Sequence, residues 1–385
     1  MTQSPLRIAF IGARGVAGTY SGIETYYQEV GSRLAQRGHE VTAYCRSHFT
    51  PDVPTYMGIR IRRLPCVRSK HFETLSHSIL STIDSLLRPF DIVQYHAIGS
   101  APLALLPRLR GYATVVSVRG LDWQRAKWKA PARAVLRACE WASAQCPTAT
   151  VVVSRTLQRH YAETHGCEPY FIPNAVKPGI PSPPNRITAH GLHKDNFILY
   201  AGRLSPEKGV LDLLEAMRPF AGRMRLALAG GSSYSDGYID ALRRAAWDGV
   251  QFLGPVDRQT MQELYSNCYA YVLPSAMEGL SVGLLEALSY GTCILTTNIP
   301  ENTEVIGSAG LTFTHGDVAE LRGLIARILD EPGLVQDLRR RAAAQAQAQP
   351  DWDDVARQTE ELYYRLLAGK RGLANGNGNG NGHRS

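Results

Sequence analysis

The stretch at residues 196–217, "NFILYAGRLSPEKGVLDLLEAM", joins an apolar run to a polar turn and then to leucines at helical spacing. The apolar run predicts a buried strand, and the spacing of the later residues predicts an amphipathic helix. Strand, turn and helix in this order form half of a βαβ unit, from which parallel sheets are built. The turn carries Arg203 and Lys208. These two cations fit either ordinary surface charge or an anion bound at the start of the helix.

The same alternation of apolar runs and amphipathic stretches recurs on both sides of a proline-rich segment. Runs of Val and Ile without period-2 alternation are typical of strands covered on both faces. We therefore predict an α/β protein with two doubly wound, Rossmann-like domains that face a cleft. The predicted parts are an N-terminal domain at 1–176, a linker at 177–195, a C-terminal domain at 196–349, a helix at 350–370 that packs back on the N-terminal domain, and a disordered Gly/Asn tail at 371–385.

Composition narrows the class of protein. The 385 residues include 42 Lys and Arg against 34 Asp and Glu, a net charge of +8. This excess is too mild to indicate nucleic acid, but it suits a phosphate-bearing substrate or an anionic membrane surface. Seven scattered Cys residues without a C-x-x-C pair indicate reduced thiols rather than disulfides or a zinc site. Because we find neither a signal peptide nor a membrane-spanning run, we expect a cytoplasmic location, with peripheral contact at the inner face of the membrane as a further option.

A glycine-rich turn follows the first predicted strand, with Gly12, Gly15, Gly18 and Gly22. The spacing G-x-x-G-x-x-G differs from the dinucleotide fingerprint, and the second strand ends at Arg46 rather than at an acidic residue, which disfavours a dehydrogenase. Glycines here would let the backbone approach a phosphate or a sugar closely. A loop without any ligand is the alternative.

Two carboxylates mark the C-terminal domain, Glu278 at the mouth of a predicted helix and Glu286 inside its leucine-rich run. Eight helical residues span about 12 Å, which is too far for the carboxylate pair of a glycoside hydrolase. That distance would suit two ends of one extended ligand, with the amides of the helix start, at residues 279–281, available to phosphates between them. The alternative is a helix cap at Glu278 and a surface-facing Glu286.

These motifs resemble a known family. The stretch "EGLSVGLLE" (278–286) resembles the E-x7-E signature of the retaining family 4 glycosyltransferases, which have the two-domain GT-B fold, and "YAGRLSPEKG" (200–209) resembles their G-R-x-x-x-x-K-G segment. The opening "GTYSGIETYYQEV" (18–30) is similar to the acceptor-side start of that family, and "RGLDWQRAKW" (119–128) resembles its rhamnosyltransferase-like branch in cell-surface polysaccharide assembly. The resemblance covers roughly residues 6–368.

The resemblance implies that the C-terminal domain binds a nucleotide sugar. Arg203 and Lys208 would bind the diphosphate and neutralise the charge of the leaving group. Glu278 would hold hydroxyls of the donor sugar and Glu286 the ribose. The amides of Gly279, Leu280 and Ser281 would meet the phosphates. Because the sequence lacks a D-x-D run that would clamp the donor through a metal ion, we predict neither a metal nor a cofactor.

The resemblance assigns the acceptor to the N-terminal domain. Gly15 and Gly18 would form its diphosphate-facing loop, and Gly22 and Glu24 would lie on the acceptor side. Many family members have a catalytic-side His where this sequence has Arg119. Arg119 cannot act as a base at neutral pH, although it could bind a phosphate or a hydroxyl.

His96, one strand earlier, is the other candidate for the contact that the N-terminal domain would make with the reacting sugar. A histidine buried in the core without any role is the alternative.

Two basic clusters in the N-terminal half are consistent with a membrane surface or with solvated helix faces. One comprises Arg60, Arg62, Arg63, Arg68 and Lys70, and the other comprises Arg125, Lys127, Lys129, Arg133 and Arg137 with Trp123, Trp128 and Trp141. The acceptor would be a saccharide, free or linked to a polyprenyl diphosphate. The sequence predicts no nucleic-acid partner and no particular oligomeric state.

Three functions are consistent with these residues. The first is a retaining hexosyltransferase, in which front-face substitution lets the departing phosphate help deprotonate the acceptor, as the resemblance implies. The second is a nucleotide-sugar epimerase on the same architecture, which would need further acid and base groups. The third is a non-catalytic binding protein, in which Lys208 and Glu278 would be dispensable.

Overall fold

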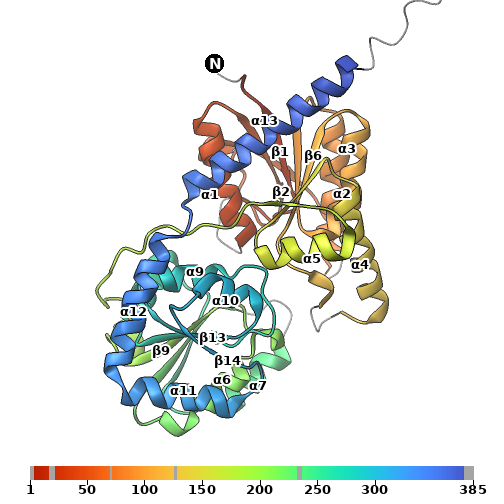
Figure 1. Ribbon diagram of the computed structural model, residues 1–385. Coiled ribbons are helices and arrows are strands. Elements are labelled where there is room, and N and C mark those ends of the chain that lie inside the picture. The colour runs from red at the N-terminus through yellow and green to blue at the C-terminus, as the bar shows by residue number, and fades with distance from the viewer. Residues whose placement is uncertain (1–3, 17–21, 70–71, 125–127, 232–235, 377–385) are drawn as a thin grey trace, which may run out of the picture. The chain divides into compact units, whose positions relative to one another are not determined.

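The computed structural model of the chain describes residues 4–16, 22–69, 72–124, 128–231 and 236–376 (Figure 1). Contacts divide them into two compact units. Unit 1 comprises the described residues up to Asn174, apart from Gln124, and the chain again from Trp352. Unit 2 comprises Gln124 and Ala175–Asp351. Each unit is a sheet flanked by helices, so the prediction of two Rossmann-like α/β domains is confirmed.

Unit 1 is built on an eight-stranded sheet in the order β3-β4-β2-β1-β5-β6-β7-β8. All neighbouring strands are parallel except the short β3, which runs antiparallel to β4. The apolar runs of β1, β5 and β6 are fully buried, as expected of strands covered on both faces. The strands are β1 (Arg7–Ile11), β2 (Glu40–Arg46), β3 (Thr55–Tyr56), β4 (Ile59–Leu64), β5 (Ile92–His96), β6 (Ala113–Val118), β7 (Ala149–Val152) and β8 (Tyr170–Phe171).

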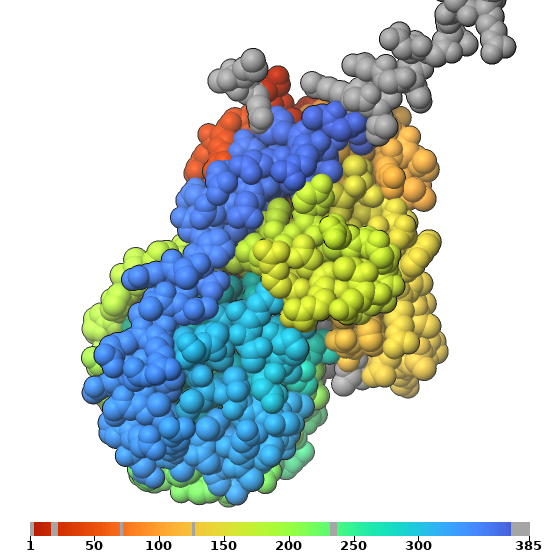
Figure 2. All heavy atoms as spheres, viewed as in Figure 1, coloured from red at the N-terminus to blue at the C-terminus, as the bar shows by residue number. Residues whose placement is uncertain are grey.

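The helices of unit 1 are α1 (Gly22–Gln36), α2 (Glu73–Leu86), α3 (Leu105–Leu109), α4 (Ala130–Gln145), α5 (Arg155–His165) and α13 (Trp352–Gly376). Helix α13 packs against α1, although more than 300 residues separate them in the sequence. Arg37 and His39 both contact the Glu360 carboxylate, at 2.6 and 2.8 Å. In the space-filling view, α13 (blue) lies against the red and orange residues of unit 1 (Figure 2).

Unit 2 has a six-stranded, fully parallel sheet in the order β11-β10-β9-β12-β13-β14. Its strands are β9 (Phe197–Ala201), β10 (Arg225–Ala229), β11 (Val250–Gly254), β12 (Ala270–Leu273), β13 (Cys293–Thr297) and β14 (Leu311–Phe313). Its helices are α6 (Val210–Met217), α7 (Asp236–Ala245), α8 (Arg258–Asn267), α9 (Val282–Ser289), α10 (Pro300–Ile306), α11 (Val318–Asp330) and α12 (Pro332–Gln347). The order changes direction beside β9, so that the carboxyl ends of β9 and β12 lie next to each other.

Two predicted boundaries differ from the structure. The whole predicted linker, residues 177–195, belongs to unit 2. Ile187 and Leu192 are completely buried in its core, and the Glu263 carboxylate accepts a 2.7 Å bond from the Arg186 amide. The prolines of this segment led to the prediction of a linker, although Ile187 and Leu192 pack in the core. Helix α13 continues to Gly376, past the predicted start of the tail at residue 371. Residues 377–385 lie outside the described part of the chain.

Candidate active site

The turn after β9 and the loop after β12 lie against each other at the carboxyl edge of unit 2. Gly209 ends the short 3-10 turn Pro206–Lys208 with φ of 65°, a conformation that glycine adopts without strain. A Cβ at this position would lie 2.3 Å from the carbonyl oxygen of Pro274. The Ala276 amide donates a 2.9 Å hydrogen bond to the carbonyl of Glu207. The glycine of the G-R-x-x-x-x-K-G segment is therefore what allows the two loops to approach.

This approach brings Lys208 and Glu278 together. Nζ of Lys208 lies 2.6 Å from Oε1 of Glu278, and the two side chains are only 14% and 10% exposed. An ion pair this sheltered is held more firmly than one on an open surface, because solvent screens it less. The sequence assigned both residues to one ligand, and the structure joins them directly.

Arg203 follows β9 on the same turn and is exposed. Its backbone carbonyl accepts a 2.7 Å hydrogen bond from the Tyr200 hydroxyl, which fixes the chain where it leaves the sheet. Beside it, a Cβ at Gly230 would lie 1.9 Å from the carbonyl oxygen of Gly202, so the ends of β9 and β10 also meet closely. The backbone that carries Arg203 is thus held from two sides.

The start of α9 provides backbone donors at the same edge. The Ser281 hydroxyl caps the helix by accepting a 3.3 Å bond from the Leu284 amide, so the cap is Ser281 and not Glu278. Within the described part of the chain, the amides of Gly279, Leu280 and Ser281 donate to no protein acceptor. Helix starts with unpaired amides favour anions.

Glu286 lies one turn from the end of α9 in a tyrosine-rich environment. Burial raises the pKa of its carboxyl above the ordinary value, while a hydrogen bond with Tyr265 and the charge of Arg258 oppose the rise. The ring of Tyr265 stacks on that of Tyr290 with centroids 5.6 Å apart. A Cβ at Gly283 would lie 2.7 Å from the Tyr271 hydroxyl, so this glycine allows α9 to pack closely against the tyrosine side chains. Glu286 is therefore not a freely solvated surface group.

In unit 1, His96 is fully enclosed at the end of β5. Its ring packs among Phe10, Tyr26 and Tyr27, with centroid distances of 5.6, 4.9 and 4.9 Å. Neither ring nitrogen has a hydrogen-bond partner among the described residues. Burial lowers the pKa of His96 well below its ordinary value, and the charge of Arg119 lowers it further. His96 is thus a neutral imidazole at pH 7.

Arg119 lies beside His96 at the end of β6. Its guanidinium carbon lies 4.4 Å from the centroid of the Tyr26 ring, and one of its nitrogens donates to the side-chain oxygen of Asn174. Burial lowers the pKa of Arg119 to about 10, so that it remains a cation at neutral pH. The structure thus brings His96 and Arg119 together. The tyrosine platform and Asn174 were not predicted, because nothing in their local sequence distinguishes them from core residues.

The glycine-rich turn after β1 closes on neighbouring strands. Gly12 has φ of 123°, and a Cβ there would lie 2.3 Å from the carbonyl oxygen of His96. A Cβ at Gly15 would lie 2.2 Å from the Thr50 hydroxyl. Glu24, in the first turn of α1, is buried and accepts a 3.0 Å bond from the Arg14 amide. Glu24 therefore holds the turn itself.

Gly22 is the first residue of α1. Gly18, the other glycine that the sequence assigned to this loop, lies outside the described residues.

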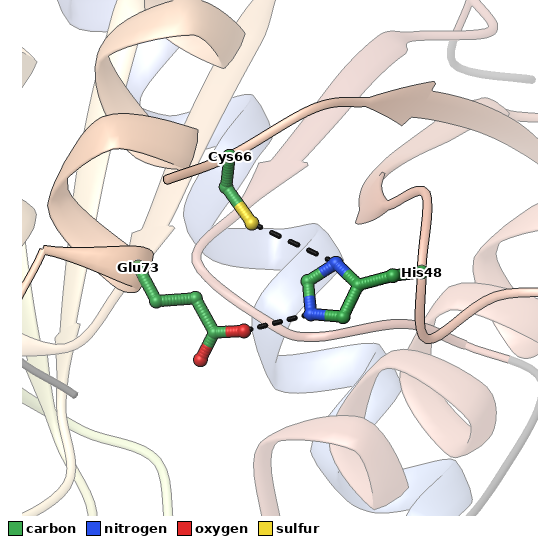
Figure 3. A group of neighbouring side chains, drawn as sticks. All are labelled: His48, Cys66 and Glu73. Carbon is green, nitrogen blue, oxygen red and sulfur yellow. Dashed lines mark hydrogen bonds and ion pairs between the residues drawn. The ribbon is translucent and has the colours of Figure 1, made fainter. Parts of the chain in front are cut away.

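Two other groups of described side chains in unit 1 have donor atoms of the kind that bind metals: His48, Cys66 and Glu73, and Glu140, His160 and His165. In the first group, Nε2 of His48 lies 2.8 Å from Oε1 of Glu73, and its Nδ1 lies 3.7 Å from Sγ of Cys66 (Figure 3). In the second group, Nε2 of His160 and Nε2 of His165 lie 2.6 and 2.8 Å from the same oxygen of Glu140. Hydrogen bonds within each group already engage these atoms.

Comparison with known proteins shows which families of domains the chain contains. Residues 20–179 match the model described as Glycosyltransferase Family 4, and residues 185–349 match the model described as Glycosyl transferases group 1. The chain carries two glycosyltransferase domains. All of the candidate residues that the structure describes lie within them, apart from the glycine turn at residues 12–15.

Known relatives share mainly parts of these glycosyltransferase domains. A glycogen synthase of Mycobacterium tuberculosis is 34% identical over 182 residues, which cover 46% of this chain and 43% of that protein. An O-antigen chain mannosyltransferase B of Escherichia coli is 29% identical over 206 residues, 52% of this chain and 53% of that protein. The matched region thus spans about half the length of these curated relatives or less.

Solved structures share the whole fold, which is GT-B. Sucrose-phosphate synthase from Thermosynechococcus elongatus superimposes with a TM-score of 0.82 at 22% identity, over 94% of this chain and 100% of that chain. HepE of Anabaena in complex with UDP-glucose superimposes with a TM-score of 0.78 at 16% identity, over 94% and 100% of the two chains. Nothing in these comparisons favours the epimerase alternative. Among the described helices, none combines the length and the apolar character needed to cross a bilayer.

Proposed function

We propose that the protein is a retaining glycosyltransferase that moves a hexosyl unit from a nucleotide-diphosphate sugar to a saccharide acceptor in surface polysaccharide assembly. The observation that carries this proposal is the sheltered Lys208–Glu278 pair, 2.6 Å apart, beside the start of α9. A cation, a carboxylate and helix-start amides at one sheet edge supply contacts for a diphosphate and for sugar hydroxyls together.

Each residue at this edge has a distinct task in the proposal. Lys208 and Arg203 bind the diphosphate and stabilise the negative charge that grows on the leaving nucleoside diphosphate. Glu278 accepts hydrogen bonds from donor-sugar hydroxyls and keeps Lys208 in position before the donor arrives. The amides of residues 279–281 meet the phosphates, and Glu286 accepts from the ribose. A pre-placed cation of this kind stabilises the transition state without waiting for solvent to reorganise.

The chemistry at the acceptor follows from the state of the residues in unit 1. His96 is neutral and completely buried, so it supports the edge of unit 1 from within and does not contact the acceptor itself. Arg119 remains a cation and can bind an oxygen of the acceptor or of a phosphate. With no acid–base residue assigned to the acceptor hydroxyl, the departing phosphate takes its proton on the same face of the sugar, which retains the configuration at the anomeric carbon.

The acceptor in this proposal is linked to a polyprenyl diphosphate, and the protein works as a peripheral membrane enzyme. The resemblance of residues 119–128 to the rhamnosyltransferase-like branch and the similarity to an O-antigen chain mannosyltransferase both support a surface polysaccharide as the product. The positive net charge supports an anionic acceptor.

A thermal-shift panel of UDP, GDP, dTDP and ADP tests the donor assignment. A nucleotide at about a hundred times its Kd should add about 2.7 kcal/mol to the stability of the state that binds it. We expect at least one nucleotide to raise the Tm of the wild type and of Lys194→Ala, an exposed lysine of unit 2, but to have little effect on Lys208→Ala. If no nucleotide shifts the wild-type protein, the donor assignment is wrong. Conversion of the donor sugar without an acceptor would instead identify an epimerase.

A further inference from the structure

Helix α2 buries its polar side chains and exposes its apolar ones. His77, Ser78, Ser81, Thr82 and Ser85 are completely buried. The apolar side chains lie on the opposite face and are exposed: Leu75, Ile79, Leu80 and Ile83. Helices of water-soluble domains normally have the reverse orientation, with the apolar stripe toward the core. The orientation of α2 therefore needs an explanation.

Hydrogen bonds hold the polar face of α2 inward. The Ser78 hydroxyl lies 2.8 Å from that of Ser100, and the Thr82 hydroxyl lies 2.9 Å from that of Tyr95 on β5. If α2 rotated about its axis, the Ser78 and Thr82 hydroxyls would lose these partners on other elements, and unsatisfied buried polar groups are costly. The outward apolar face is thus a fixed part of the fold.

Neighbouring segments extend the exposed surface. Helix α3 contacts α2 and lies beside it (Figure 1). Leu87 just after α2 is 80% exposed, and Leu109 at the end of α3 is 76% exposed. We define the α2–α3 apolar surface as the exposed residues Phe72, Leu75, Ile79, Leu80, Ile83, Leu87, Leu105, Leu106 and Leu109. So many exposed large apolar residues on adjacent helices are unusual in a protein that works alone in water.

The charges around this surface are mainly positive. The described residues of segment 67–112 include four basic ones, Arg68, Arg88, Arg108 and Arg110, against three acidic ones, Glu73, Asp84 and Asp91. Each of these acids is already paired with arginine: Glu73 with Arg46, Asp84 with Arg62 and Arg88, and Asp91 with Arg7, at 2.7 to 3.1 Å. The net charge that remains for a partner is therefore positive.

We propose that the α2–α3 apolar surface docks on an anionic lipid bilayer, with its leucines and isoleucines in the interface and the surrounding arginines on lipid headgroups. An apolar face bordered by basic residues has the composition of an interfacial membrane helix. A second copy of the chain fits less well, because a two-fold contact would set these arginines against one another. A helix that lies in the interface needs no membrane-spanning length.

This inference deepens the proposed membrane contact and relocates it. The sequence offered two basic clusters for that contact, with solvated helix faces as the alternative. In the structure, Arg60, Arg62 and Arg63 of the first cluster are ion-paired within unit 1. In the second cluster, Arg137 stacks on Trp123 at 4.4 Å, and Arg125 and Lys127 lie outside the described residues. The inference concerns the surface that docks and is independent of the identity of the donor.

Flotation with lipid vesicles tests the proposal, without donor or acceptor present. We compare vesicles of phosphatidylcholine with vesicles that also contain phosphatidylglycerol, using the wild type, the double variant I83Q/L87Q and the control I180Q. Ile180 is an exposed apolar residue of unit 2, so its variant matches the chemical change elsewhere. The wild type and I180Q should bind the anionic vesicles. The double variant should bind them at least about tenfold more weakly. Salt should weaken the binding of the wild type.

Two results would overturn the proposal. One is equal binding of wild type and I83Q/L87Q to anionic vesicles. The other is a wild-type dimer in sedimentation that I83Q/L87Q converts to a monomer while neither binds vesicles, because the surface would then join two copies. Unchanged Tm and unchanged nucleotide binding of the double variant would show that folding and the donor site are intact. Failure of vesicle binding therefore leaves the proposed transfer reaction to its own test.

Discussion

The carboxyl edges of the two sheets are equivalent places in two Rossmann-like units, yet they hold opposite kinds of chemistry. In unit 2, the edge carries a preformed ion pair, Lys208 with Glu278, beside the donors of a helix start. In unit 1, the edge carries a neutral histidine enclosed by aromatic rings, and its nearby cation, Arg119, stacks on one of those rings. The edge of unit 2 holds a paired cation and carboxylate, whereas at the edge of unit 1 the histidine is buried among aromatic rings and only Arg119 is charged.

This difference shows what a repeated fold fixes and what it leaves open. In each unit a glycine with positive φ lets a turn close on a neighbouring backbone carbonyl, Gly12 on His96 and Gly209 on Pro274. The closure places side chains at the edge, and the residues carried there decide the chemistry. If the proposed function is right, damage to the two edges should have different consequences.

Removal of the cation in unit 2 should have the largest effect. Lys208→Ala deletes the charge that stabilises the leaving group and leaves Glu278 without its partner. We expect kcat for sugar transfer to fall by about 10²- to 10³-fold, the usual effect of losing one transition-state contact. Steady-state kinetics with the donor identified in the nucleotide panel measure it. Lys194→Ala is the matched control, and an unchanged kcat for Lys208→Ala would show that the edge of unit 2 does not act on the leaving group.

Substitution of the two closing glycines should come next. Gly12→Ala and Gly209→Ala each place a Cβ 2.3 Å from a backbone carbonyl oxygen, in a conformation that disfavours side chains. We expect each to destabilise its own unit by about 2–4 kcal/mol, as strained backbone positions do. Hydrogen exchange should report the loss in unit 1 for Gly12→Ala and in unit 2 for Gly209→Ala. Gly222→Ala has open space around its new methyl group and serves as the control. Equal tolerance of all three substitutions would contradict the role of the turns.

A fall in pH should change the stability of the two units in opposite directions. Burial lowers the pKa of His77 to about 4 and that of His96 well below its ordinary value. The unfolded chain therefore binds more protons at these sites than unit 1 does as pH falls through 6.5, and unit 1 loses stability. His77 alone contributes a loss of up to about 2 kcal/mol between pH 7 and pH 5.

Glu286 should act in the opposite direction in unit 2. Because its pKa is raised in the folded state, its cost to stability is largest at high pH and is relieved as pH falls toward that pKa. Hydrogen exchange at pH 7 and pH 5, corrected for intrinsic rates, measures both units in one sample. A unit 1 that gained stability in acid would contradict the neutral state of the buried histidines.

The conservative change Arg119→Lys should have the smallest effect. Lysine keeps the positive charge but loses the planar group that stacks on Tyr26 and donates to Asn174. We expect about a tenfold fall in kcat/KM, which corresponds to about 1.4 kcal/mol. Arg133→Lys, at an exposed position of α4, is the control. A loss as large as that of Lys208→Ala would mean that the edge of unit 1 also acts on developing charge.

Helices α2 and α6 show how much of a helix's orientation can be predicted from its sequence. In both, the spacing of apolar residues indicates which side chains share a face. In α6 that face is buried, with Leu213, Leu214 and Met217 in the core, as the pattern predicts. In α2 the apolar face is exposed, because hydroxyl partners on other elements hold its polar face inward. Periodicity identifies a face, but only the neighbouring elements decide where that face points.

The candidate site was predictable to a similar extent. The order of strands and helices places the segments of Lys208 and Glu278 at carboxyl ends of a parallel sheet, where sequence reasoning expected one ligand. The direct ion pair depends on β9 and β12 being neighbours, which the sequence does not state. The enclosure of His96 depends on rings from β1 and α1, far away in the chain. Long-range packing therefore accounts for what the sequence left open.

Isothermal titration of the best-binding nucleoside diphosphate into three proteins tests the central claim most directly. If Lys208 holds the donor diphosphate at the edge of unit 2, the wild type and Lys194→Ala should bind with the same Kd. Lys208→Ala should bind at least about tenfold more weakly, since it loses a charge-assisted contact. A Lys208→Ala variant that binds the nucleotide as tightly as the wild type would contradict the account.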